Sequence, residues 1–358
     1  MRSILLAGSL ALVASLVGTP AVIRFFRGRG YGQLIREDGP RSHFVKRGTP
    51  TMGGMAIILA AVFAYMVATL AQGPGVSAGG LLAMGVFVGM GLVGFVDDYL
   101  KLRHNRSLGL NKTAKLVGQG IISIIFAFGA EYVADTSTRL SFIGATGIDF
   151  GVATWAITMG GVQFGPLFVV AIFLILSLAS NAVNLTDGLD GLAAGTSALI
   201  FGAYVVIAFW QFRNTEVYPP EVYLHADAIA IAAAATMGAT LGFLWWNAPP
   251  AKIFMGDTGS LALGGMLAAM AVLTETELLL VILGGLYVVE IMSVIAQVAS
   301  FRIFKRRVFK MAPLHHHFEL VGWQETTIIV RFWIVAGLAV AFGLGLFYND
   351  FLAGGGIG

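Results

Sequence analysis

Ten long apolar blocks follow one another along the chain, and short polar stretches separate them. A helix needs about 20 predominantly apolar residues to cross the hydrocarbon core of a bilayer, and each block is close to that length. The pattern therefore predicts an all-α polytopic integral membrane protein with about ten transmembrane helices. The predicted spans are residues 3–23, 51–71, 79–96, 115–134, 166–184, 191–210, 225–246, 258–274, 278–301 and 328–348.

The composition agrees with this fold class. Hydrophobic residues make up 57% of the 358 residues and charged residues only 11%, whereas a soluble domain carries about 25% charged residues. The absence of cysteine excludes disulfides, thiolate metal sites and cysteine nucleophiles. Glycine-rich stretches such as GVFVGMGLVG (85–94) suit close helix packing in lipid. Since the sequence contains neither a clear repeat nor an inter-domain linker, we expect a single transmembrane domain over residues 1–358.

Lysine and arginine are distributed unevenly over the segments between the spans. Eighteen of the 22 fall in residues 24–50, 97–115, 247–257 and 302–327, which the alternation of spans places on one side. Because cytoplasmic loops are enriched in these residues, we assign that side to the cytoplasm and both termini to the outside. The first apolar block also has the form of a signal peptide, but the denser positive charge behind it favours a retained span. The net charge is thus a sidedness signal, and nucleic-acid binding is not expected.

One outside connection differs from the others in composition. Residues 135–165 are rich in threonine, serine, glycine and β-branched side chains. Such a composition is typical of short strands joined by turns. We expect a short periplasmic hairpin here, between the fourth and fifth spans.

Five polar clusters all fall on the inner face, which a random scatter of polar residues would not produce. They are GTPTMGG (48–54), VDDYLK (96–101), NAVNLTDGLDGLA (181–193), NAPPAKIFMGDTGS (247–260) and MAPLHHHFE (311–319).

The adjacent Asp97 and Asp98 close the third predicted span. Carboxylates are disfavoured at the negative end of a helix by about 0.3–1 kcal/mol each, so this pair requires a compensating cation. Lys101 supplies part of it, since it lies four residues after Asp97 on the same helix face. A divalent metal such as Mg²⁺, which prefers oxygen ligands, is the stronger candidate. The alternative is a solvated helix end near the lipid headgroups.

In the segment 181–193, the polar side chains of Asn181, Asn184, Asp187 and Asp190 recur every three residues. On a helix this spacing forms a slowly rotating stripe. The two asparagines belong to an apolar run, where an unsatisfied amide is costly. The alternative is an ordinary glycine-containing turn with a capping aspartate.

Asp257 stands at the expected start of the eighth span, where an N-cap role is by itself a sufficient explanation. The same stretch also offers Asn247 as an amide, Lys252 for phosphate and Phe254 as a stacking face. Together these residues resemble a nucleotide site more than a cap. Carboxylates from three connections would then converge on one Mg²⁺ and a diphosphate.

The three histidines His315, His316 and His317 follow a basic amphipathic stretch that is expected to lie on the inner membrane surface. Adjacent residues do not share a helix face, so they form a poor tridentate metal site. Hydrogen bonding to phosphate and a polar interfacial turn both remain open for them.

Four classes of function are compatible with a polytopic membrane protein of this kind: a transporter, a metalloprotease, a scaffold and an enzyme. Transporters place ionisable residues near the middle of the membrane, and here Glu290 is the residue that lies well inside a predicted span. A zinc metalloprotease of the HExxH type is excluded because the motif is absent. A structural scaffold does not explain the convergence of Asp, Asn, Lys and His. An enzyme that joins a charged cytosolic substrate to a membrane lipid fits best.

The five clusters, in this order and on one face, resemble the polyprenyl-phosphate N-acetylhexosamine-1-phosphate transferase superfamily. FVDDYLK and NLTDGLDGL point to the superfamily, and PLHHHFE points to its phospho-N-acetylmuramoyl-pentapeptide transferase family. The resemblance covers residues 36–332 approximately. It implies Mg²⁺-dependent transfer from UDP-N-acetylmuramoyl-pentapeptide to undecaprenyl phosphate with release of UMP. It also implies the bacterial inner membrane, an active site on the cytoplasmic face and a homodimer.

On this resemblance we expect Asp257 to bind Mg²⁺, with Asp187 as a further ligand. Asp97 or Asp98 would deprotonate or orient the lipid phosphate, with a preference for Asp97. The alternative within the superfamily is a transferase for another UDP-N-acetylhexosamine. The expected substrate-binding residues are Lys46, Thr51, Lys101, Lys112, Lys115, Asn181, Asn184, Asp187, Asp190, Asn247, Phe254, His315, His316 and His317.

Overall fold

The computed structural model consists mainly of long helices and describes residues 1–29, 32, 46, 48–72, 75–104, 109–142, 147–149, 157–159 and 162–353. Among these residues, ten helices are long and apolar enough to cross a membrane, which confirms the predicted number. They are α1 (Arg2–Gly28), α2 (Gly54–Gln72), α3 (Ala78–Arg103), α4 (Lys112–Tyr132), α5 (Pro166–Thr186), α6 (Leu192–Arg213), α7 (Pro220–Asn247), α8 (Gly256–Leu273), α10 (Gly285–Phe304) and α12 (Glu325–Ala353).

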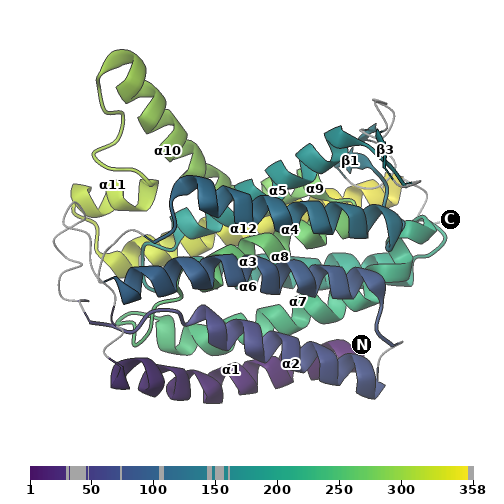
Figure 1. The fold of residues 1–358 in the computed structure, drawn as a ribbon, viewed down its shortest axis with the longest axis horizontal. Helices are drawn as coiled ribbons and strands as arrows, with labels where there is room; N and C mark the ends of the chain where they lie inside the picture. Colours follow the sequence, from purple (N-terminus) through teal and green to yellow (C-terminus); the bar gives the residue numbers. More distant parts are fainter. Residues whose placement is uncertain are drawn as a thin grey trace.

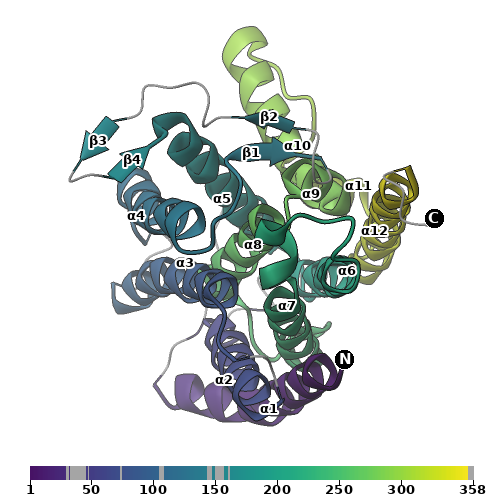
Figure 2. The ribbon, with the colours of Figure 1, turned by 90° about the vertical axis from the view of Figure 1, so that its right-hand side faces the viewer.

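Helix α8 lies at the centre of the bundle, with the other helices around it (Figure 2). All of its residues from Thr258 to Leu273 are buried. Small residues allow this close packing: a Cβ atom at Gly94 on α3 would collide with the carbonyl oxygen of Asp257. The predicted packing role of the glycines is thus confirmed at the contact between α3 and the start of α8.

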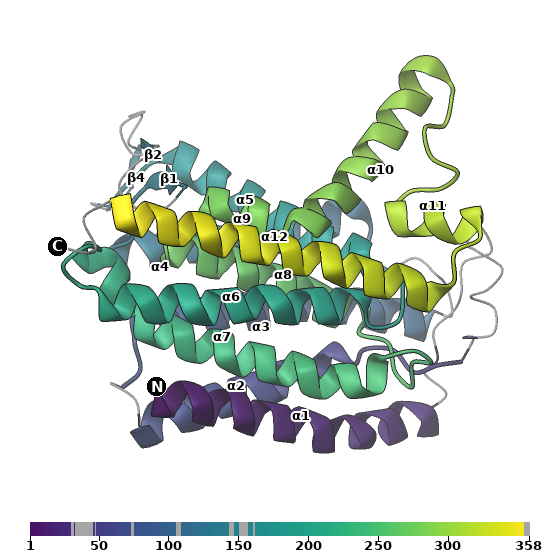
Figure 3. The ribbon, with the colours of Figure 1, turned by 180° about the vertical axis from the view of Figure 1, so that it is seen from behind.

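The ninth span is not the single continuous helix predicted over residues 278–301. It is divided into α9 (Glu277–Leu283) and α10, and the intervening Gly284 has a φ of −88° and a ψ of 21°. The break lies at Gly284, where two consecutive glycines, Gly284 and Gly285, weaken the helix. Beyond it, α10 leans away from the bundle, and the short helix α11 (Leu314–Val321) lies beside it (Figure 3).

Two antiparallel strand pairs occur between α4 and α5, where a single hairpin is predicted. The first pair joins β1 (Arg139–Ser141) to β2 (Gly147–Asp149), and the second joins β3 (Ile157–Met159) to β4 (Val162–Phe164). Both chain termini lie at the end of the bundle that carries these strands, opposite α11 (Figure 1). We call these two ends the strand end and the α11 end. The assignment of the strand end to the periplasm stays a prediction.

A buried acidic residue, Glu275, lies at the strand end in the turn between α8 and α9. It is 5% exposed, and its Oε1 atom has no hydrogen-bond partner among the described residues. The neighbouring Glu277 accepts a 3.1 Å hydrogen bond from the Ser141 backbone N–H, which attaches β1 to α9. Burial and the charge of Glu221 raise the pKa of Glu275 to about 7, while the charge of Arg139 opposes this shift. Glu275 therefore binds a proton more tightly in the folded protein than in the unfolded chain.

We expect Glu275 to make the protein less stable as the pH rises from about 4.5 to about 7. In this window the folded state retains a proton that the unfolded state has released, so the free energy of unfolding falls with pH, by about 2–3 kcal/mol. Glu275→Gln should remove the part of the fall that is due to Glu275 and leave the part that is due to Glu277, whose pKa burial raises to about 8. The measurement is the thermal midpoint of the detergent-solubilised protein at several pH values. Glu216→Gln, an exposed control at the same end, should keep the wild-type profile. An unchanged profile in Glu275→Gln would contradict the assignment.

Candidate active site

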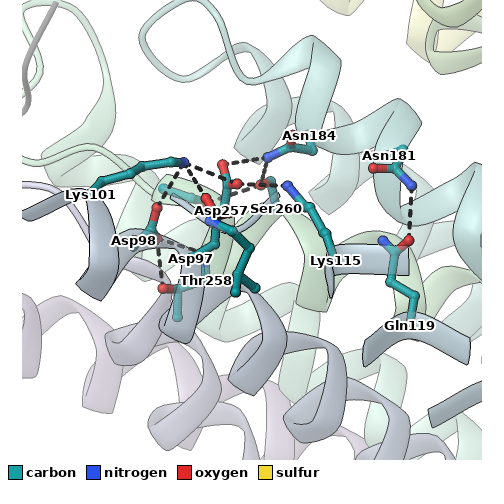
Figure 4. A network of polar contacts seen from close by, with 12 residues as sticks. Asp97, Asp98, Lys101, Lys115, Gln119, Asn181, Asn184, Asp257, Thr258 and Ser260 are labelled. Carbon is teal, nitrogen blue, oxygen red and sulfur yellow. Dashed lines mark hydrogen bonds and ion pairs between the residues drawn. The ribbon is translucent and has the colours of Figure 1, made fainter. Parts of the chain in front are cut away.

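Three aspartates meet at the α11 end of the bundle. Asp97 and Asp98 come from α3 and Asp257 from the first turn of α8, and one carboxylate oxygen of each lies within 4.8 Å of the others (Figure 4). The chain approaches this point closely because Gly256 has a φ of +74°, which favours glycine. A Cβ atom there would lie only 2.5 Å from Asp98 Oδ2. We call Asp97, Asp98 and Asp257 the three-aspartate group.

The prediction that Asp97 and Asp98 end a helix is wrong. Helix α3 continues to Arg103, so both aspartates lie more than one turn before its end, and the argument from the helix dipole loses its force. The compensating cation is on the same helix. Lys101 Nζ lies 2.5 Å from Asp97 Oδ2, 3.5 Å from Asp98 Oδ1 and 3.1 Å from Asp257 Oδ2. Lys101 thus contacts all three carboxylates.

The N-terminus of α8 is capped by Asp98 rather than by Asp257. Asp98 Oδ2 accepts hydrogen bonds from the backbone N–H of Thr258 at 2.9 Å and from its hydroxyl at 2.8 Å. These bonds hold α3 against α8, and they satisfy one of the unpaired N–H groups of the helix. The alternative explanation of Asp257 as an N-cap is therefore wrong, and its carboxylate faces other side chains.

Two residues from neighbouring helices hold the carboxylate of Asp257. Lys115 Nζ on α4 donates to Oδ2 at 2.7 Å. Asn184 Nδ2 on α5 donates to Oδ1 at 2.8 Å and also to Ser260 Oγ at 2.8 Å. Residues from α3, α4, α5 and α8 thus converge on Asp257, and Lys101, Lys115 and Asn184 are among them (Figure 4). Their substrate-binding roles stay predictions.

Two predicted substrate-binding residues lie outside this convergence. Asn181 donates hydrogen bonds to Gln119 Oε1 on α4 at 3.2 Å and to the Ser177 carbonyl oxygen at 2.7 Å, so it joins two helices. Lys112 is exposed in the first turn of α4. Gln119 is not among the predicted residues, although an amide within an apolar block requires a hydrogen-bond partner.

Asp187 follows α5 directly and borders the three-aspartate group without belonging to it. No hydrogen bond of its carboxylate occurs among the described residues. Burial raises the pKa of Asp187 to about 8, and the nearby charges of Asp257, Asp98 and Asp190 act in the same direction. Since Asp187 is not one of the three carboxylates that lie within 4.8 Å of one another, its role as a metal ligand stays a prediction.

Asp190 belongs to a second polar cluster, centred on Lys46. Lys46 Nζ lies 2.7 Å from Asp190 Oδ1 and 2.5 Å from Glu325 Oε1 at the start of α12. The other oxygen of Asp190 accepts a 2.9 Å hydrogen bond from the Ala251 backbone N–H, and the Asp190 N–H donates to Glu325. Glu325 was missed because an acidic residue in the first turn of a helix is already explained by the helix dipole.

Asn247 links the two loops that enter the site. Its side-chain oxygen accepts from the Gly191 N–H at 3.0 Å and its amide group donates to the Ile253 carbonyl oxygen at 2.9 Å. Asn247 is 2% exposed, so these bonds indicate a positioning role in addition to the predicted contact with substrate.

Thr51 and Phe254 lie on two adjacent segments at the edge of the site. The Phe254 N–H donates to the Pro50 carbonyl oxygen at 2.8 Å, and the Gly53 N–H donates to the Phe254 carbonyl oxygen at 2.9 Å. Thr51 Oγ1 would lie 3.0 Å from a Cβ atom at Gly256. The segment before α2 is thereby placed beside the N-terminus of α8.

The three histidines have three different environments, as expected for adjacent residues of the helix α11. His315 is fully buried. His316 Nδ1 lies 2.6 Å from Glu319 Oε2, and His317 Nδ1 accepts a hydrogen bond from the Lys310 backbone N–H at 3.1 Å. A single metal ion coordinated by all three is therefore not supported.

Comparisons with known proteins agree on one family. The family model described as glycosyl transferase family 4 matches residues 78–275, which include the three-aspartate group. A phospho-N-acetylmuramoyl-pentapeptide-transferase from Frankia casuarinae is 58% identical, with 99% of this chain and 100% of the relative covered. The relative of the same name from Streptomyces coelicolor is 54% identical over 97% of this chain and 98% of its own length. The chain belongs to glycosyl transferase family 4 and, within it, to the phospho-N-acetylmuramoyl-pentapeptide-transferases.

Proposed function

We propose that the protein transfers phospho-N-acetylmuramoyl-pentapeptide from its UDP-activated form to undecaprenyl phosphate. The products would be UMP and the first lipid-linked intermediate of peptidoglycan synthesis. The observation that supports this most directly is the three-aspartate group with Lys101 and Lys115 against it, at one end of an apolar bundle. Such a site suits the transfer of a phosphoryl group between a charged soluble substrate and a lipid.

The donor set of the site fits Mg²⁺. Three carboxylate oxygens lie within 4.8 Å of one another, and Mg²⁺ prefers hard oxygen ligands. Asp257 and Asp98 would hold the ion, with Asp187 at its edge, and Asp97 would remain available to the lipid phosphate. When bound, Mg²⁺ would neutralise the charge on the diphosphate of the nucleotide substrate.

The protein's own residues supply position and charge. Lys101 and Lys115, which contact Asp257 in the structure, would turn to the phosphate groups of the substrates. Asp98 is held on α8 by two hydrogen bonds from Thr258, whereas Asp97 Oδ2 contacts the flexible ammonium group of Lys101. Asp97 is therefore the better candidate to orient the lipid phosphate and accept its proton. Asp190 and Phe254 would hold the uracil.

The location follows from the charge distribution along the chain. The site lies at the α11 end, which is the end of the predicted inner segments with 18 of the 22 lysines and arginines. We propose a bacterial inner-membrane protein with this end at the cytoplasm. The homodimer rests on the family resemblance.

The test is a UMP-release assay with the purified protein in detergent. Undecaprenyl phosphate and UDP-N-acetylmuramoyl-pentapeptide should together give UMP in the presence of Mg²⁺, and chelation of the metal should stop the release. Metal-independent release would contradict the Mg²⁺ proposal. In a parallel reaction UDP-N-acetylglucosamine replaces the nucleotide substrate, and a preference for it would favour another transferase of the superfamily.

A further inference from the structure

Glu290 is a fully buried carboxylate on α10 that caps a helix distant in the sequence. Its Oε2 accepts a 2.8 Å hydrogen bond from the Leu314 backbone N–H, and its Oε1 accepts a 3.2 Å bond from the His315 backbone N–H. These two N–H groups are at the start of α11, whose own N-cap residue is Pro313 and provides no side-chain cap. Glu290 therefore provides the cap that the local sequence lacks.

The capping of α11 explains how a carboxylate such as that of Glu290 can be buried inside the protein. An isolated carboxylate inside a protein is costly unless hydrogen bonds or opposite charges compensate it. The two N–H groups and the positive end of the α11 dipole supply that compensation. In the sequence, Glu290 is the observation in favour of a transporter. In the structure, its carboxylate instead holds helix α11 in place.

His315 connects the capped helix to the active site. Its Nδ1 atom lies 3.3 Å from Glu290 Oε1, a contact that becomes an ion pair when the ring is protonated. On the other side of the ring, a Cβ atom at Gly188 would collide with Nε2. Neither ring nitrogen has a hydrogen-bond partner among the described residues. The ring thus lies between Glu290 and the turn that carries Asp187 and Asp190.

A second side chain of α10, Gln297, holds the loop that precedes α11. Gln297 Oε1 accepts hydrogen bonds from the N–H groups of Val308 and Phe309, both at 3.0 Å, and its amide donates to the Phe309 carbonyl oxygen at 3.0 Å. With Glu290, two side chains about two turns apart on α10 position the whole segment that leads into α11.

We propose that Glu290 is a positioning residue that places the histidine motif on the nucleotide side of the active site. By capping α11 and contacting His315, it holds the helix against the Gly188 turn. The buried His315 ring then keeps α11 packed against the turn that carries Asp187 and Asp190, on the side that the proposed function assigns to the UDP-linked substrate. The expected kinetic effect of Glu290 on the UDP-linked substrate rests on the proposed function. The expected effect of Glu290 on the position of α11 does not.

The experiment compares Glu290→Ala and Glu290→Gln with Ser293→Ala in the full-length protein in detergent. Ser293 is a matched control: it is buried one turn along α10 and donates a 2.6 Å hydrogen bond to the Glu290 backbone carbonyl oxygen rather than to its carboxylate. Hydrogen–deuterium exchange over residues 311–320 reports the Leu314 and His315 N–H groups directly. Steady-state UMP release gives kcat and KM for each substrate.

In Glu290→Ala we expect exchange of the Leu314 and His315 amides to rise about tenfold or more, because both lose a charged acceptor. The KM for the UDP-linked substrate should rise about tenfold, while kcat and the KM for undecaprenyl phosphate stay near wild type. Glu290→Gln, which keeps one acceptor oxygen, should recover part of both effects, and Ser293→Ala should show neither.

Unchanged exchange at these amides would overturn the proposal, and so would an equal loss toward both substrates together with a lowered thermal midpoint. The proposed function fails in a different way. If the wild-type protein released no UMP, the function would be wrong, and the exchange measurement would still decide whether Glu290 holds α11.

Discussion

Asp257→Asn is expected to lower kcat about a thousandfold or more. One oxygen of Asp257 accepts from Asn184 and the other from Lys115, with Lys101 at 3.1 Å. An asparagine has one acceptor oxygen, so its amino group would face either the Asn184 amide or the two ammonium groups. The variant therefore loses both a metal ligand and the acceptor that arranges its neighbours. The measurement is UMP release at saturating concentrations of both substrates.

The control for this variant is Asp227→Asn, which makes the same change in a half-buried carboxylate of α7 away from the site. Its activity should equal that of the wild type. Titration with Mn²⁺, followed by electron paramagnetic resonance, separates metal binding from catalysis. Near-normal turnover in Asp257→Asn, or undiminished Mn²⁺ binding, would remove Asp257 from the metal site.

Lys101→Met is expected to change metal affinity and turnover in opposite directions. Three carboxylates face the ammonium groups of Lys101 and Lys115, which leaves the ionised site one negative charge in excess. Removal of Lys101 increases that excess, so the apparent affinity for Mg²⁺ should rise severalfold. Turnover should nevertheless fall about a hundredfold, because the site loses a cation that is needed for phosphate.

Arg103→Met is the matched control, since it removes a positive charge from an exposed position two residues further along α3. Isothermal titration with Mg²⁺ and the UMP-release assay give the two quantities. If Lys101→Met bound Mg²⁺ more weakly, the ammonium group would be supporting the metal site rather than competing with the ion. Full activity would show that Lys101 does not act on phosphate.

The helices were predictable because a long apolar block in lipid satisfies its backbone hydrogen bonds only as a helix. Their ends were less predictable. Hydropathy marks where the bilayer ends, whereas α3 continues past that point to Arg103, and this placed Asp97 and Asp98 within the helix. The break at Gly284 has a local signal in two consecutive glycines, but the direction in which α10 leaves the bundle has none.

The residue types of the candidate site were predictable from the sequence, but most contacts between these residues were not. Lys101 lies four residues after Asp97, and helix geometry alone brings these two side chains together. Lys46 and Glu325 are 279 positions apart, and Glu290 and Leu314 are 24 apart across a helix break. No local pattern relates such residues, because their contact depends on how separate helices pack.

The sequence by itself determined the ten spans, the gathering of the polar clusters at one face and the family resemblance. These depend on composition and on spacing within single segments, where local physics is sufficient. The tertiary structure decided that Asp98, not Asp257, caps α8, that Lys101 contacts all three aspartates, and that Glu290 holds α11. The contacts of Asp98 with Thr258, of Lys101 with Asp257 and of Glu290 with Leu314 join separate helices. Only the packing of those helices against one another brings the partners within hydrogen-bond distance.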